Sequence, residues 1–141
     1  MTYAPVIVTQ ADVEQAWRSL MRPLGWTRTS TWLMLVGPDD RPLPHLTEIE
    51  DCGGPPPPGG ADRLGELLAG LVRGALPPGV RVAFLRSRPG AGLADDDDRA
   101  WARTLLAAAQ VAGLRSEVVH LATDVDVLPL PVDEPALPAG A

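Results

Sequence analysis

With 141 residues and a hydrophobic content of 45%, the chain has the length and composition of one globular domain, which excludes a wholly disordered protein. The net charge of −6 argues against general DNA binding, which needs a basic face, so nucleic acid is not an expected partner. The start of the sequence lacks the charge and apolar core of a signal peptide, and no apolar run approaches the roughly 18 residues of a membrane span, so we expect a soluble cytoplasmic protein with no membrane association.

The first expected element is a helix over residues 9–22. Its start, Thr9-Gln-Ala-Asp12, resembles a capping box in which Asp replaces the usual Glu or Gln. Apolar residues then recur at helical spacing, and Pro23 ends the segment.

A β-hairpin is expected next, over residues 29–50. An apolar strand is followed by a turn rich in Pro and Asp and by a second strand of alternating residues. Pro42 and Pro44 place this second strand at a sheet edge, because proline cannot donate a ladder hydrogen bond. A loop rich in Pro and Gly follows over residues 52–60.

The second half of the chain alternates helices with buried strands. We expect a helix over 61–76, a strand over 80–87, a helix over 95–112, a strand over 116–123 and a short last strand within 125–130. Residues 1–130 are therefore predicted to form a single α/β domain with helices on both faces of a mixed sheet. Residues 131–141 are predicted to be a disordered tail.

The most informative segment is the end of the strand over 80–87, where Arg86 and Arg88 reach a strand-to-helix turn. Such turns hold active sites in α/β folds, but this one carries no His, no Cys and no phosphate-binding glycine pattern. The two arginines share one side of the strand. They could recognise an anion, or they could pair with the Asp95–Asp98 run across the turn. That run lacks the spaced ligands and the glycine of a calcium loop.

The element order resembles the JAB/JAMM metalloenzyme superfamily, in its RadC-like branch, over residues 29–130. Ser87 and Pro89 fall at positions of the family motif, and Val119-His-Leu-Ala-Thr123 is similar to the last core strand of RadC-like domains. The resemblance implies a three-layer α/β/α sandwich around a mixed sheet, with a cytidine-deaminase-like topology. In this family, the two histidines of a His-Ser/Thr-His motif and a downstream aspartate bind zinc, and an upstream glutamate activates water.

The departures from the family motif decide what the resemblance implies here. Arg86 and Arg88 stand at the two histidine positions. Strict spacing puts the aspartate ligand on Arg99 and the motif serine on Asp96, whereas a loop one residue shorter puts the ligand on Asp98. A guanidinium group stays protonated, offers no lone pair to Zn²⁺ and repels a dication. The resemblance therefore implies a domain without zinc and without hydrolase activity.

Few other residues suggest chemistry. Glu48 or Glu50 could occupy the position of the family's glutamate, but without a metal either is only a strand carboxylate. His120 lies within a predicted buried strand and is expected to be a core or rim residue with satisfied hydrogen bonds, and His45 is expected to be exposed. Cys52 has no partner for a disulfide and no metal-ligand spacing.

We therefore expect a non-catalytic, metal-free domain that needs no cofactor and acts in protein–protein interaction or as a scaffold. One alternative is an anion- or nucleotide-sensing domain that uses the two arginines, and a second is an enzyme of an unrelated class. Exposed strand edges are compatible with a homodimer. The candidate site residues are Arg86, Ser87, Arg88, Asp98, Glu48, Glu50 and His120.

Overall fold

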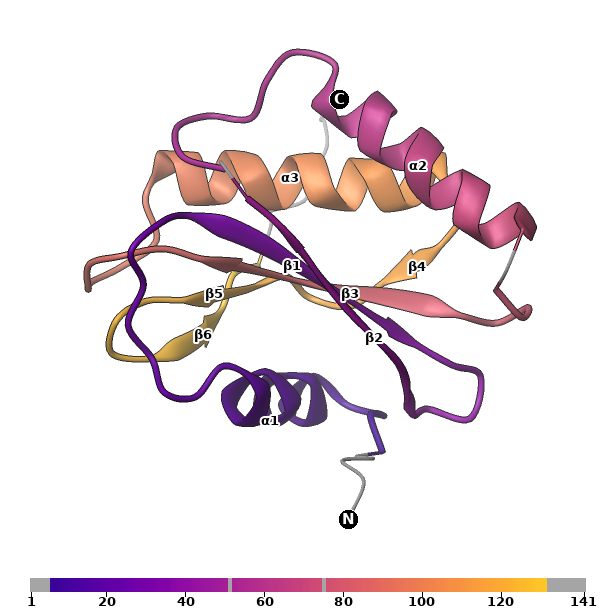
Figure 1. The fold of residues 1–141 in the computed structure, drawn as a ribbon, viewed down its shortest axis with the longest axis horizontal. Helices are drawn as coiled ribbons and strands as arrows, with labels where there is room; N and C mark the ends of the chain where they lie inside the picture. The colour runs from indigo at the N-terminus through magenta and orange to yellow at the C-terminus, as the bar shows by residue number, and fades with distance from the viewer. Residues whose placement is uncertain (1–5, 51, 75, 132–141) are drawn as a thin grey trace, which may run out of the picture.

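The computed structural model describes residues 6–50, 52–74 and 76–131. In this part of the chain, six strands form one mixed sheet in the order β2-β1-β3-β5-β6, and β4 also pairs with β3. Helix α1 covers one face of the sheet, and α2 and α3 cover the other (Figure 1). The elements are α1 Gln10–Leu20, β1 Ser30–Val36, β2 Pro42–Ile49, α2 Gly60–Gly74, β3 Arg81–Ser87, α3 Asp96–Val111, β4 Arg115–Ser116, β5 His120–Ala122 and β6 Val127–Pro129. The predicted mixed α/β class is confirmed.

The sheet places β3 at its centre. Strand β1 runs antiparallel to both β2 and β3, whereas β5 runs parallel to β3 and antiparallel to β6. Every residue of β3 is buried, because helices cover both faces of the sheet. Strand β2 lies at the edge, where Pro42 and Pro44 were expected to place it.

The two faces of the sheet have separate hydrophobic cores. Val82 and Phe84 pack in the core beneath α2 and α3, whereas Ala83 and Leu85 pack in the core beneath α1. Because side chains alternate along a strand, Arg86 continues the first set. The central strand therefore delivers Arg86 to the face that carries α3.

Two helices begin with the same local device. Thr9 caps α1, and its hydroxyl accepts from the backbone N–H of Asp12 while the Asp12 carboxylate accepts from that of Thr9. Asp95 and Asp98 form the equivalent box at the start of α3. Each box satisfies backbone donors that a helix start leaves without a partner. The capping box predicted at Thr9 is confirmed.

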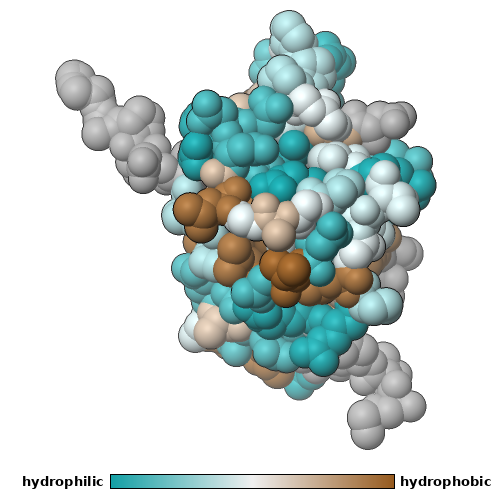
Figure 2. Space-filling model, turned by 90° about the vertical axis from the view of Figure 1, so that its left-hand side faces the viewer, coloured by the Kyte–Doolittle hydropathy of each residue, from teal (hydrophilic) through white to brown (hydrophobic). Residues whose placement is uncertain are grey.

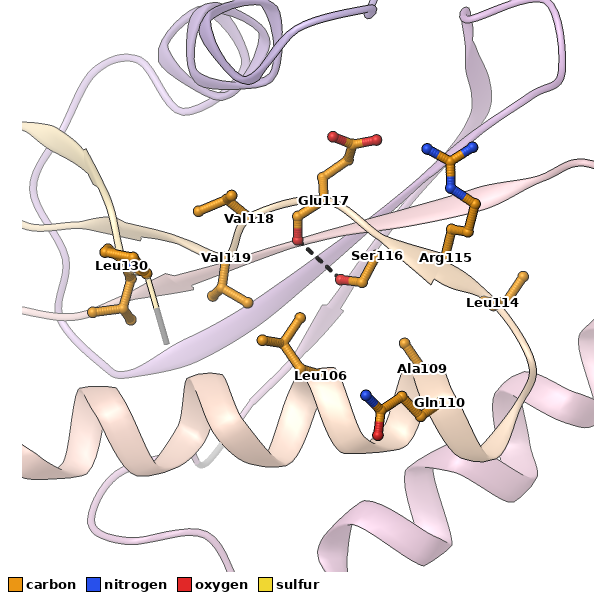
Figure 3. Close-up of a pocket in the computed structure, with 11 residues that line it drawn as sticks. Leu106, Ala109, Gln110, Leu114, Arg115, Ser116, Glu117, Val118, Val119 and Leu130 are labelled. Carbon is orange, nitrogen blue, oxygen red and sulfur yellow. Dashed lines mark hydrogen bonds between the residues drawn. The ribbon is translucent and has the colours of Figure 1, made fainter. Parts of the chain in front are cut away.

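The strand predicted over 116–123 is not continuous, which corrects the sequence-based expectation. It is divided into β4 and β5, and residues 117–119 lie outside the regular ladder. The Ser116 hydroxyl donates to the Glu117 carbonyl oxygen (Figure 3), and the ring Nδ1 of His120 lies 3.0 Å from the Val118 carbonyl oxygen. These local bonds compete with strand pairing. A pocket of about 460 Å³ lies between this break and α3.

The other boundaries differ by one or two residues from the predicted ones, as is common where helix ends fray. The side chain of His45 and residues 132–141 lie outside the described part, so the exposure expected for His45 and the predicted tail are not addressed by it. None of the described helices combines the length and apolarity that crossing a membrane requires.

Candidate functional site

The predicted site is a buried cluster of Arg86, Arg88 and Asp98, which we call the arginine–aspartate cluster. Arg86 is only 2% exposed, at the end of the central strand. Its Nε donates to Oδ1 of Asp98 at 2.7 Å, and its Nη1 donates to the Cys52 carbonyl oxygen at 2.7 Å. Its guanidinium carbon also lies 5.7 Å from the centre of the Trp101 ring, within cation–π range.

Arg88, two residues further along the chain, binds the same carboxylate. Its Nε lies 2.9 and 3.0 Å from the two oxygens of Asp98, and its Nη2 donates to Oδ2 at 2.8 Å. Nη2 also donates to the Leu93 carbonyl oxygen at 3.2 Å, which ties the arginine to the loop before α3. The hydrogen bonds to Asp98 raise the pKa of Arg88.

Asp98 is wholly buried and receives hydrogen bonds from both arginines and from the Asp95 backbone N–H. Burial by itself raises the pKa of this carboxyl. The bonds from Arg88, the Asp95 backbone and Arg86 lower it by more, so that the pKa is about 2. Asp98 is therefore ionised at neutral pH and neutralises one of the two positive charges of the buried Arg86 and the partly buried Arg88.

The sequence left open whether the two arginines bind an anion or pair with the acidic run. In the structure, they pair with Asp98 of that run across the turn. Within the acidic run, Asp98 makes these pairs, Asp95 caps α3, and Asp96 pairs with Arg99 at 2.7 Å. Asp98, rather than Arg99, faces the strand end.

The cluster does not fit the zinc ion that members of the JAB/RadC family bind at these positions. Its three side chains supply one carboxylate and two permanently protonated groups, whereas a catalytic zinc site has about three protein ligands. In the described residues, no group of three or more His, Cys, Asp or Glu side chains is placed to hold a metal ion.

The two candidate glutamates contact residues outside the arginine–aspartate cluster. Glu48 accepts a hydrogen bond from the Ser30 hydroxyl at 2.7 Å and lies 3.6 Å from Arg28. Glu50 pairs with the same arginine at 3.2 Å. Both carboxylates are thus held by a surface arginine, Arg28, at the sheet edge.

Ser87 and His120 are buried on the opposite face of the sheet, toward α1. The Ser87 hydroxyl accepts from Nε1 of Trp32 at 2.9 Å, so the structure does not bring it to the arginine–aspartate cluster. His120 is wholly buried, and desolvation lowers its pKa. Its Nε2 has no hydrogen-bond partner among the described residues, so the expectation that its hydrogen bonds are satisfied is wrong for this atom.

Trp101 and Asp124 belong to this end of the molecule, although neither was a predicted site residue. Trp101 follows Asp98 by three positions, a helical spacing that puts both on one face of α3. The Asp124 carboxylate accepts from the backbone N–H groups of Trp26 at 2.9 Å and Gly90 at 2.8 Å. One side chain thus connects three loops, and only the fold could reveal this role.

These connected loops carry exposed apolar side chains. Leu93, in the loop after β3, is 87% exposed, and Val125, in the turn after β5, is 67% exposed. We call the surface formed by the loop after β3, which carries Leu93, and the turn after β5, which carries Val125, the loop-end surface. Figure 2 views this side of the molecule and shows apolar side chains gathered in a band between hydrophilic areas.

Comparisons with protein-family models, with curated proteins and with solved structures found no match for this chain.

Proposed function

We propose that this chain is a metal-free, non-catalytic domain of the JAB/RadC type that binds a partner protein. The observation that carries the proposal is that Asp98 binds both Arg86 and Arg88 in a buried cluster. Arg86 and Arg88 stand at the two histidine positions of the family motif, and Asp98 stands at the aspartate position if the loop is one residue shorter than in the family. An internal set of ion pairs in place of the metal supports a domain that keeps the fold without the hydrolase chemistry.

The loop-end surface is the part that we propose for partner binding. Exposed apolar residues mark interaction sites when they gather in one area. Leu93 and Val125 are exposed on these loops, and Figure 2 shows an apolar band on this side of the molecule. The hydrogen bonds of Asp124 hold the loops in place before binding, which lowers the entropic cost of association. The partner would therefore offer a complementary apolar patch. A cytoplasmic location is part of the same proposal, and the free thiol of buried Cys52 is compatible with it.

The anion-sensing alternative has less support. A phosphate or carboxylate ligand would have to compete with Asp98, which already holds Nε of both arginines. Arg86 is also almost fully buried, so it offers no open side to a dissolved anion.

Partner binding is tested by affinity purification with the wild-type chain and with two single variants. Leu93→Asp should abolish recovery of a specific partner, because it places a charge in an apolar interface. Leu67→Asp is the matched control: Leu67 is also an exposed apolar residue, at 64%, but it lies on α2. Equal recovery with both variants would contradict the proposed surface.

The absence of catalysis is tested on the purified wild-type protein. Metal analysis by inductively coupled plasma spectrometry should find no stoichiometric zinc, and isopeptide substrates should not be cleaved. Stoichiometric zinc or measurable turnover would overturn this part of the proposal.

A further inference from the structure

A second candidate site lies between the sheet and the two helices on its α3 side, next to the arginine–aspartate cluster, with which it shares Trp101. It is a cavity of about 180 Å³ with mainly apolar walls, to which Ile49, Leu64, Trp101 and Leu105 contribute. A water molecule occupies about 30 Å³ in the liquid, so the cavity has room for on the order of six waters. This is the size of a small ring compound rather than of a single bound water.

Thr31 places an unpaired polar atom in this cavity. Its side chain is wholly buried and lines the cavity, and its Oγ1 has no hydrogen-bond partner among the described residues. Leu33 and Leu35, which follow it on the same face of β1, belong to the core beneath α2 and α3. A buried hydroxyl without a partner is unfavourable, because the hydrogen bonds that it made to water are not replaced. A ligand with a polar atom at this point would supply the missing partner.

Arg63 supplies a positive charge to the same cavity. It is an exposed residue of α2 that lines the cavity, and its side chain forms no ion pair or hydrogen bond with any residue in the described ranges. Unlike Arg86 and Arg88, it is therefore not neutralised by a carboxylate of the residues that the structure describes. The cavity thus combines a buried hydroxyl, an apolar body and an arginine that is open to solvent.

We propose that this cavity binds a small aromatic monocarboxylate that carries one further polar atom. The ring fills the apolar space beside Trp101, the polar atom bonds to Thr31 Oγ1, and the carboxylate pairs with Arg63. This binding does not depend on the proposed partner surface, because Leu93 and Val125 do not line the cavity.

The test uses 3- and 4-hydroxybenzoate as probes, with benzoate and phenol as truncated controls, in calorimetric or NMR titrations of the full chain. At least one hydroxybenzoate should bind saturably. Thr31→Val, which keeps the shape of the side chain but removes the hydroxyl, should weaken that binding about tenfold and leave benzoate binding unchanged. Arg63→Gln should weaken both carboxylates and leave phenol unchanged.

Arg73→Gln is the matched control, since Arg73 is an exposed arginine of the same helix that does not line the cavity. Its affinity for the probes should equal that of the wild type. Failure of both hydroxybenzoates to bind in the millimolar range would overturn the proposal and would leave ordered water as the partner of Thr31. Binding that neither Thr31→Val nor Arg63→Gln weakens would also overturn it, because the probe would then occupy another place.

Discussion

Arg86 and Asp98 form a buried ion pair that joins the end of the central strand to the first turn of α3, with 2.7 Å between Nε and Oδ1. Two charges can leave water without large loss only when their geometry is good and their other hydrogen-bonding atoms are satisfied. Both conditions hold here, because Arg88 and the Asp95 backbone complete the bonds of the carboxylate. The pair therefore helps to stabilise the fold, and its loss should lower the free energy of unfolding.

Asp98→Asn should lower the free energy of unfolding by about 3–5 kcal/mol, because it leaves the buried guanidinium group of Arg86 and the partly buried one of Arg88 without an anion. Urea denaturation monitored by tryptophan fluorescence measures this loss. Asp97→Asn is the matched control in the same helical turn, and its effect should stay within about 0.5 kcal/mol. Similar losses in both variants would show that the cluster has no special role in stability.

The pH dependence of stability should reflect the low pKa of Asp98. A carboxyl whose pKa falls on folding, here from 3.8 to about 2, stabilises the fold above the higher value. That contribution, about 2 kcal/mol, is lost as the pH falls from about 5 to about 2. Because Asp12, Asp124 and Asp126 also have lowered pKa values, the measurement should be an NMR titration of the Asp98 carboxyl itself.

Variants of Arg88 and Arg99 test which interaction lowers the pKa of Asp98. Arg88→Gln should raise the pKa of Asp98 toward 3.8, because it removes the hydrogen bonds and the charge that lower it. Arg99→Gln should leave it unchanged, because Arg99 pairs with Asp96. An Asp98 that titrates near 3.8 in the wild type would contradict the ion pairs that we describe.

The crossing of α2 and α3 depends on Gly65. A Cβ at this position would lie 2.5 Å from the Cβ of Val111 and 3.0 Å from the Ala108 carbonyl oxygen. Gly65→Ala should therefore destabilise the protein by about 1–3 kcal/mol, as overpacking does. Gly70→Ala, in the same helix with nothing within 4 Å, should instead stabilise it by up to about 1 kcal/mol through helix propensity. Thermal unfolding measures the melting temperature of both variants. A Gly65→Ala variant that melts at the wild-type temperature or above would contradict the close packing.

The loop-end surface should loosen when Asp124 is replaced. In Asp124→Ala, the backbone N–H groups of Trp26 and Gly90 lose their acceptor, so their amide hydrogens should exchange faster. Amides in the centre of β3 should exchange as in the wild type. Unchanged exchange at Trp26 and Gly90 would show that Asp124 does not hold these loops together.

Local signals explain what could be predicted from the sequence. The helices and most strands follow from hydrophobic periodicity, and the box of Thr9 and Asp12 is a local pattern. Arg86, Arg88 and the acidic run were recognised as one site because they flank one turn. The sequence could not show that Asp98, and not Arg99, faces the strand end. Which of the two faces it depends on the rotation of α3 about its axis, and the length of the loop before α3 sets that rotation.

Contacts between distant segments explain what could not be predicted. The break between β4 and β5 accompanies the pairing of Glu117 with Arg81, which is 36 positions away and on another strand. The cavity with Thr31 and Arg63 exists only where β1, α2 and α3 meet. No periodicity within one element contains that information.

If Arg86, Arg88 and Asp98 stand where the family holds its metal, as we propose, then replacing both arginines with histidine should create a zinc site. Arg86→His/Arg88→His would supply two neutral imidazole ligands beside the carboxylate of Asp98. We expect stoichiometric zinc in this variant and none in the wild type, and the zinc should be lost when Asp98→Asn is added. A folded double-histidine variant that binds no zinc, or a wild-type protein that does, would contradict this proposal.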